Sequence, residues 1–239
     1  MYEYLIGDLI LGILWLFCFL LRKDLRKPMI WSGAAYAALM TIIFIILKVI
    51  SLFVIIENYR TFNPGYWSPN TLFDLNRITG GHSIEDALFM FFTGGIVAFI
   101  YEFFFHKKIK LKINHKYQVK ALIFSFIISV IFAAFYKINL IYPLILFGFA
   151  GALFIWFNRK DLIKHSLLGG IIFLVIYFIF FSLTNLLFPN FIEQTYNLNN
   201  ISGILLFKIP LEEFLFALSF GLLWSPFYEY EHGEKVVDL

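Results

Sequence analysis

The chain has 239 residues, of which 61% are hydrophobic and 15% are charged, and its formal net charge is +3 at pH 7. Soluble globular domains carry about 25% charged residues, so this composition excludes a soluble protein and predicts one that lies in a membrane. The small positive charge does not indicate nucleic-acid binding, because the basic residues lie in short loops between apolar segments.

Apolar segments follow one another along the chain, and a helix needs about 20 such residues to cross a membrane. Seven segments approach or exceed this length, namely 4–21, 29–56, 84–105, 119–136, 139–157, 166–188 and 204–227. The apolar runs are continuous, which is typical of helices, whereas strands of a membrane barrel alternate between apolar and polar residues. We therefore expect an all-α integral membrane protein with seven transmembrane helices.

The basic residues are distributed unevenly over the loops. Most of the 19 lysines and arginines follow the first segment, separate the third from the fourth, follow the fifth, or lie in the C-terminal tail. These positions all fall on one side of the membrane if seven helices alternate in direction, and basic loops stay in the cytoplasm. The N-terminus is then expected outside and the C-terminus inside.

Two short motifs occur twice in the chain. The basic motif Arg22-Lys23-Asp24-Leu25 recurs as Arg159-Lys160-Asp161-Leu162, and the acidic motif Ser83-Ile84-Glu85-Asp86 is matched by Pro210-Leu211-Glu212-Glu213. In both halves the basic motif closes the first helix of a three-helix unit, and the acidic motif opens the third helix.

This duplication predicts two repeats, residues 1–105 and 139–239, joined by a basic loop and a linking helix over 106–138. Three helices plus one linking helix make an even number of crossings, so both repeats run in the same direction through the membrane. Such parallel repeats are related by an axis along the membrane normal. We expect the functional site where the two third helices meet.

Each acidic motif places two carboxylates at the head of an apolar helix, Glu85 with Asp86 and Glu212 with Glu213. Charged groups that enter hydrocarbon are costly and suggest a functional site. The alternative is helix capping, because acids in the first turn complement the positive helix end, and Ser83 with Asp86 has the form of a capping box. Two adjacent acids in both copies favour a shared site. Neighbouring helical residues point about 100° apart, so at most one of each pair faces it.

Aromatic residues make up 21% of the chain, and a subset of them could line a pocket and stabilise a cation through their ring faces. Phe89 and Phe216 follow the two acidic pairs. Tyr66 and Trp67 lie in the outer loop of the first repeat, where anchoring at the membrane interface is favoured over substrate contact.

Glu102 and Glu229 lie 17 positions beyond Glu85 and Glu212, about 25 Å further along a helix, near the cytoplasmic surface. We expect them to be structural and to pair with the arginines of the basic motifs. No pair of histidines has the spacing of metal ligands, so no metal site is predicted. No nucleotide fingerprint, P-loop or Ser-His-Asp pattern is present, and no cofactor is predicted.

The three-helix unit resembles the membrane lycopene cyclases, a family with a heterodimeric bacterial type and fused archaeal and fungal relatives. The resemblance lies in Arg-Lys-Asp after the first helix and Pro-x-Glu-Glu-x-x-Phe at the start of the third. The fused relatives join two such units through one extra helix, which gives seven spans. The second copy, Pro210 to Phe216, matches this pattern, whereas Ser83 and Asp86 depart from it in the first.

The resemblance implies a redox-neutral, cofactor-independent reaction on a lipophilic carotenoid of the lycopene type, in the plasma membrane of a prokaryote. An acid protonates the terminal double bond of an end group, the cation closes a six-membered ring, and a base removes a proton. The implied acid–base residues are Glu212 and Glu213, then Glu85 and Asp86, and the implied substrate contacts are Phe89, Phe216, Tyr66 and Trp67.

Other functions remain open at this point. The chain could bind an isoprenoid or lipid without catalysis, could act on another isoprenoid, or could be a small transporter with the acids as a proton relay. Little beyond Thr93 and Ser219 continues a polar path through the third helices, which disfavours the transporter. Membrane lipids are the other expected partners, and the oligomeric state is left open.

Overall fold

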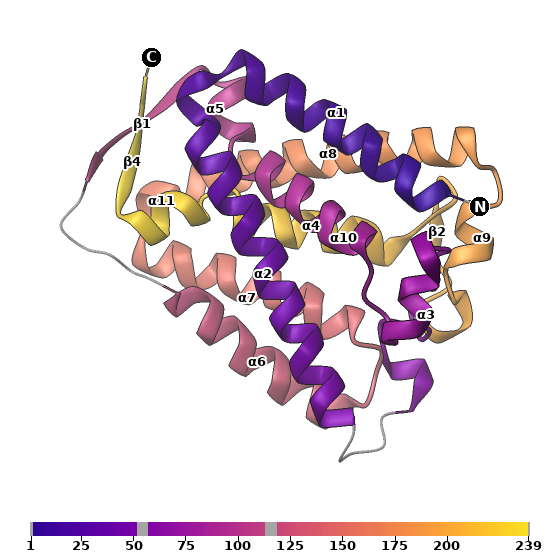
Figure 1. Ribbon diagram of the computed structural model, residues 1–239. Helices are drawn as coiled ribbons and strands as arrows, with labels where there is room; N and C mark the ends of the chain where they lie inside the picture. The colour runs from indigo at the N-terminus through magenta and orange to yellow at the C-terminus, as the bar shows by residue number, and fades with distance from the viewer. Residues whose placement is uncertain (1, 52–56, 113–118, 239) are drawn as a thin grey trace.

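The computed structural model describes residues 2–51, 57–112 and 119–238, and within them the fold is mostly helical (Figure 1). The end of the second predicted segment, residues 52–56, and the central part of the basic loop, residues 113–118, lie outside the described residues. Several of these helices are long and apolar enough to cross a membrane, which is consistent with the predicted all-α membrane protein.

The first half contains two long helices, a shorter third helix that is broken near its end, and an outer loop with short helical turns. Its elements are α1 (Glu3–Leu21), η1 (Lys23–Leu25), α2 (Arg26–Ser51), η2 (Asn58–Arg60), η3 (Leu72–Asp74), α3 (Leu75–Thr79), α4 (Ile84–Val97), α5 (Ile100–Phe104) and β1 (Lys107–Lys112). The linking helix α6 (Lys120–Tyr136) follows.

The second half has the same order of long and short helices. Its elements are α7 (Ile141–Asn158), η4 (Lys160–Leu162), α8 (Ile163–Leu187), α9 (Phe191–Thr195), η5 (Leu198–Asn200), β2 (Leu205–Leu206), β3 (Ile209–Pro210), α10 (Leu211–Trp224), α11 (Phe227–His232) and β4 (Glu234–Asp238).

Helices α4 and α10 form the centre of the bundle (Figure 1). Helix α4 packs against α1 and α2, and α10 packs against α7 and α8, while α6 lies outside and packs on α7. Most of α10 is buried, whereas α6 buries only Ala121, Ser125 and Ser129 and leaves apolar side chains exposed. Exposed apolar faces of this extent suit contact with lipid chains.

Glycines at matched positions bring the central helices close to their neighbours. A Cβ atom on Gly94 would lie 3.1 Å from the main-chain oxygen of Ser32 on α2, and one on Gly221 would lie 2.9 Å from the Cα atom of Gly170 on α8. Small residues allow this approach, which is the usual way in which helices gain packing energy inside a membrane.

The third helix of each half differs from the continuous span that the sequence predicted. Helix α4 ends at Val97 and continues as α5 after a break, and residues 205–210 contain the short hairpin β2–β3 instead of helix. Pro210 has no main-chain N–H to donate to a preceding helical turn, so α10 begins only after it. In the second half the third helix is also broken between α10 and α11, and Pro226 lies at that break.

Four of the described helices are long and apolar enough to cross a membrane, namely Glu3–Leu21, Lys23–Val49, Ile141–Asn158 and Lys160–Leu187. Helix α6, at 17 residues, is shorter. Helices α4 and α10 have 14 residues each, about 21 Å, against a hydrocarbon layer of about 30 Å. Neither of these two helices therefore spans such a layer by itself.

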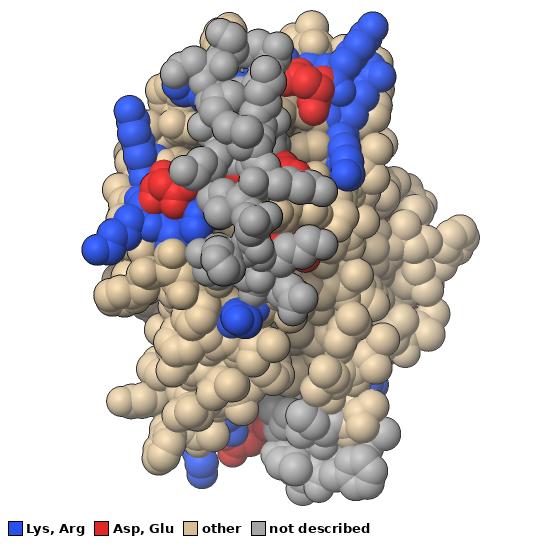
Figure 2. Space-filling model, turned by 90° about the vertical axis from the view of Figure 1, so that its left-hand side faces the viewer, with Lys and Arg blue, Asp and Glu red and all other residues tan. Residues whose placement is uncertain are grey.

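The strand pair β1–β4 joins the two halves at one end of the bundle, and Lys and Arg side chains gather around it (Figure 2). The strands are antiparallel, with Ile109 opposite Val236. These two residues lie 127 positions apart, which is also the separation of the two acidic motifs. The two strands therefore pair symmetrically about the Ile109–Val236 pair, whose members are equivalent residues of the two halves.

The two basic motifs lie beside these strands and make equivalent contacts. Arg22 binds Asp24 and donates to the main-chain oxygens of Glu102 and Lys107. Arg159 binds Asp161 and donates to the main-chain oxygen of Glu234 at 3.0 Å. The sequence had suggested that Arg22 or Arg159 pairs with the carboxylate of Glu102. The hydrogen bond from Arg22 goes instead to the main-chain oxygen of Glu102.

Candidate active site

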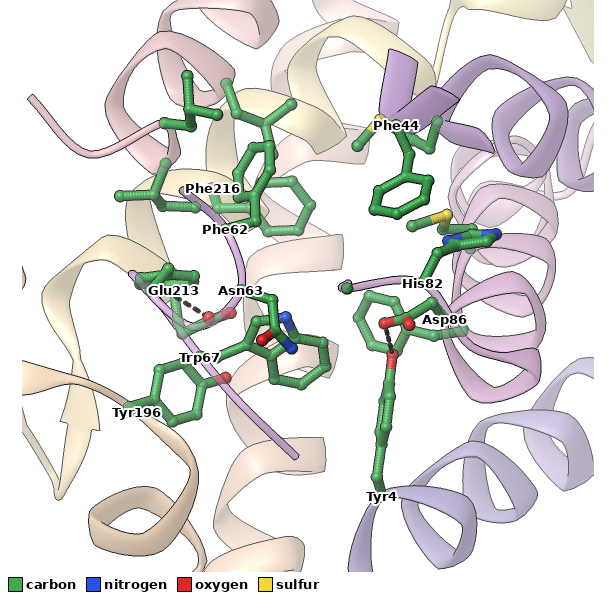
Figure 3. Close-up of a pocket in the computed structure, with 18 of the residues that line it drawn as sticks. Tyr4, Phe44, Phe62, Asn63, Trp67, His82, Asp86, Tyr196, Glu213 and Phe216 are labelled. Atoms are coloured by element: carbon green, nitrogen blue, oxygen red, sulfur yellow. Dashed lines mark hydrogen bonds between the residues drawn. The ribbon is translucent and has the colours of Figure 1, made fainter. Parts of the chain in front are cut away.

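A cavity of about 420 Å³ lies between the two halves, beneath the outer loops (Figure 3). Its size is within the range of about 300–1,000 Å³ that is usual for ligand pockets. The walls come from α1, α2, α4, α8, α10 and the loops that precede α4 and α10, and most of their side chains are aromatic or aliphatic. Asp86 and Glu213 lie on opposite walls of this space, and Glu3 also borders it.

Glu213 is held by tyrosine hydroxyls from three separate segments. Tyr66 of the first outer loop donates to Oε1 at 2.5 Å, and Tyr177 of α8 donates to Oε2 at 2.6 Å. The hydroxyl of Tyr196, after α9, also faces this carboxylate. Glu213 is only 4% exposed. Both carboxylate oxygens are therefore fixed in position within an aromatic surrounding.

Tyr66 stays a hydrogen-bond donor in this arrangement. Burial raises the pKa of its hydroxyl well above the usual value, and the nearby carboxylate of Glu213 raises the pKa further. A phenol with a raised pKa keeps its proton, so it donates to Glu213 throughout the neutral pH range.

Asp86 forms a second, different assembly on the facing wall. It accepts hydrogen bonds from the Tyr4 hydroxyl at 2.9 Å, from the Ser83 main-chain N–H at 2.7 Å and from the Ser83 hydroxyl at 2.8 Å. Ser83 and Asp86 form a capping box at the start of α4. Asp86 therefore caps the helix and also lines the cavity, so the capping role does not exclude a functional one.

The first acid of each pair points away from the cavity and binds an outer loop. Glu85 accepts the main-chain N–H of Leu72 at 2.6 Å. Glu212 accepts the main-chain N–H of Ser202 at 2.9 Å and the hydroxyl of Tyr142 at 2.8 Å. The angle of about 100° between neighbouring helical residues accounts for this division between the two acids.

The four aromatic residues expected to contact substrate all line the cavity. Tyr66 is 5% exposed, so its place is inside the protein and not at the membrane interface, which the sequence had favoured. Trp67 packs edge-on against Tyr4, with ring centroids 4.7 Å apart. Phe89 and Phe216 both pack near the ring of Tyr177 from α4 and α10.

Several functional candidates were missed by the sequence reasoning. Tyr4, Tyr177 and Tyr196 hold the cavity carboxylates, and Asp8 on α1 is buried near Asp86 without a hydrogen-bond partner in the described residues. An acid within an apolar helix is itself an indication of function, and Asp8 could have been found by that rule. Asp8 belongs to neither of the duplicated motifs, so the repeat does not indicate it.

Comparison with known protein families gives a match in both halves of the chain. A family model described as lycopene cyclase matches two segments of the chain, residues 4–104 and 139–231. Together these segments contain both basic motifs, both acidic pairs and all the cavity residues named above. No curated protein and no solved structure matches the chain.

Proposed function

This chain belongs to the lycopene cyclase family, and we propose that it closes a terminal end group of a lycopene-type carotenoid into a ring. The observation that carries the proposal is a buried aromatic cavity with a fixed carboxyl group on each of two facing walls, Asp86 and Glu213.

The reaction requires only that one proton is added to the substrate and one proton is removed from it. A carboxylic acid adds a proton to the terminal double bond, and a neighbouring double bond attacks the resulting cation to form a six-membered ring. A carboxylate then removes a proton from the ring, so the product is an isomer of the substrate. We assign the proton transfers to Asp86 and Glu213, because both carboxyl groups face the same cavity.

The aromatic walls favour this chemistry over capture of the cation by water. Ring faces stabilise a positive charge, and Phe89, Phe216 and Trp67 lie around the same space as the acids. The reaction also requires that water be kept from the intermediate, because water would hydrate the cation. The carboxylates of Glu85 and Glu212 act in this proposal as positioning groups, because they hold loop backbone instead of facing the substrate.

We propose further that the chain crosses the membrane seven times as two parallel repeats, 1–105 and 139–239, with the N-terminus outside. Helices α4 and α5 together cover 84–104, about 31 Å of helix, which suffices for one crossing despite the break. The basic residues around β1 and β4 favour a cytoplasmic position for that end, in a prokaryotic plasma membrane.

The test is expression in bacteria that accumulate lycopene, followed by chromatography of the extracted pigments. The wild type should yield cyclic products. Glu213→Gln should abolish them at an equal amount of folded protein, because an amide cannot exchange the proton. Glu212→Gln is the matched control, since its amide oxygen can still accept the N–H of Ser202, and it should keep most of the activity.

Two results would count against this assignment. Full activity of Glu213→Gln would remove this residue from the proton transfers. Lycopene bound unchanged by folded wild-type protein would favour a carrier of carotenoid or lipid over a cyclase.

A further inference from the structure

Three buried ionisable side chains from both halves meet at the end of the bundle that carries β1 and β4. They are Glu102 on α5, His165 on α8 and Glu229 on α11, and their exposed fractions are 0%, 3% and 0%. One ligand atom from each lies within 4.8 Å of the other two. The two glutamates are equivalent residues, 127 positions apart, so the cluster lies where the halves meet.

None of these side chains hydrogen-bonds to another side chain in the described part of the chain. This applies to all four carboxylate oxygens and to both ring nitrogens of His165. Burial of ionisable groups without partners costs several kcal/mol, and such groups in a native protein call for an explanation such as a bound ion.

The arginines of the basic motifs do not supply these missing hydrogen bonds. Arg22 donates hydrogen bonds to Asp24 and to main-chain oxygens, and Arg159 donates to Asp161 and to the main chain of Glu234. Neither guanidinium hydrogen-bonds to the carboxylate of Glu102 or Glu229 in the described residues.

The donor set and its spacing fit a divalent metal ion. Two carboxylates balance a charge of +2, and an imidazole nitrogen beside carboxylate oxygens suits zinc and related ions. Two ligand atoms at about 2.1 Å from a tetrahedral ion lie about 3.4 Å apart. Nε2 of His165 and Oε1 of Glu102 are 3.6 Å apart. Tyr101 stacks on the imidazole, with ring centroids 4.3 Å apart, and fixes its plane.

We propose that Glu102, His165 and Glu229 bind one divalent ion of the zinc class. The ion joins α5, α8 and α11 and so ties the two halves together beside the strand pair. This site is separate from ring closure, because Glu102, His165 and Glu229 are not among the residues that line the cavity with Asp86 and Glu213. The proposal therefore does not depend on the proposed function.

The test measures metal content on the full-length protein in detergent. The wild type is stripped with a chelator, loaded with Zn²⁺, desalted and analysed by elemental mass spectrometry. One zinc per chain is expected, together with a rise in Tm relative to the stripped protein. His165→Ala and Glu229→Gln should each weaken zinc binding by at least about tenfold.

The matched control is Glu231→Gln on the same helix. Glu231 pairs with His232 at 2.8 Å and is not part of the cluster, so this variant should bind zinc like the wild type. Stripped wild type that takes up no zinc would overturn the proposal without reference to any variant. Equal zinc binding by the wild type and by a monodisperse His165→Ala or Glu229→Gln protein would overturn it as well.

Discussion

Replacement of Tyr66 by Phe tests how the cavity acid Glu213 is held. The change removes one hydroxyl, which donates to Oε1 of Glu213 at 2.5 Å, and leaves the buried ring in place. A hydrogen bond to a charged group contributes about 1.5–3 kcal/mol. If this energy is lost in the transition state, cyclisation should slow by about 10- to 150-fold, since about 1.4 kcal/mol corresponds to a factor of ten.

The assay is the initial rate of ring formation in membranes with matched amounts of enzyme, measured by chromatography. Tyr59→Phe is the control, because Tyr59 lies in the same loop but is 41% exposed and does not line the cavity. Its hydroxyl contacts Glu57 and the main chain of Lys137, not a cavity carboxylate. Tyr59→Phe should keep the wild-type rate. A wild-type rate for Tyr66→Phe, or an equal loss in both variants, would refute the argument.

Two further predictions concern the packing of the bundle. Gly221→Ala places a methyl group 2.9 Å from the Cα atom of Gly170 and should destabilise the protein by about 1–3 kcal/mol, measured as a lower Tm. Gly12→Ala is the control, because its methyl group meets only the side chain of Phe92 and should lower the Tm less. An unchanged Tm for Gly221→Ala would contradict the close approach of α8 and α10. Arg159→Lys loses the pair of hydrogen bonds from the guanidinium to the carboxylate of Asp161, and it should also lower the Tm. A Tm equal to that of the wild type would contradict a stabilising role for these two bonds.

The different tasks of adjacent acids were predictable only in part. Helical geometry shows that Glu212 and Glu213 cannot face the same groove. It does not show which of them faces the cavity, because that depends on how α10 is rotated about its own axis. The rotation is set by packing against α7 and α8, for example where Gly221 meets Gly170.

The same reasoning explains why the tyrosines and the buried cluster were missed. Tyr66, Tyr177 and Tyr196 are far apart in the chain, and no spacing rule connects them before the outer loop folds over α8 and α10. Glu102 and Glu229 were linked by the repeat, but His165 lies outside the motif that recurs and joins them only in three dimensions.

The sequence by itself determined the membrane class, the duplicated motifs and the family, because hydrophobic run length, charge placement and local motifs are properties of short segments. The tertiary structure decided which carboxylates line the cavity, which tyrosines hold them and where the central helices break. These features depend on contacts between distant segments and on the rotation of each helix, and packing energy inside the bundle fixes both.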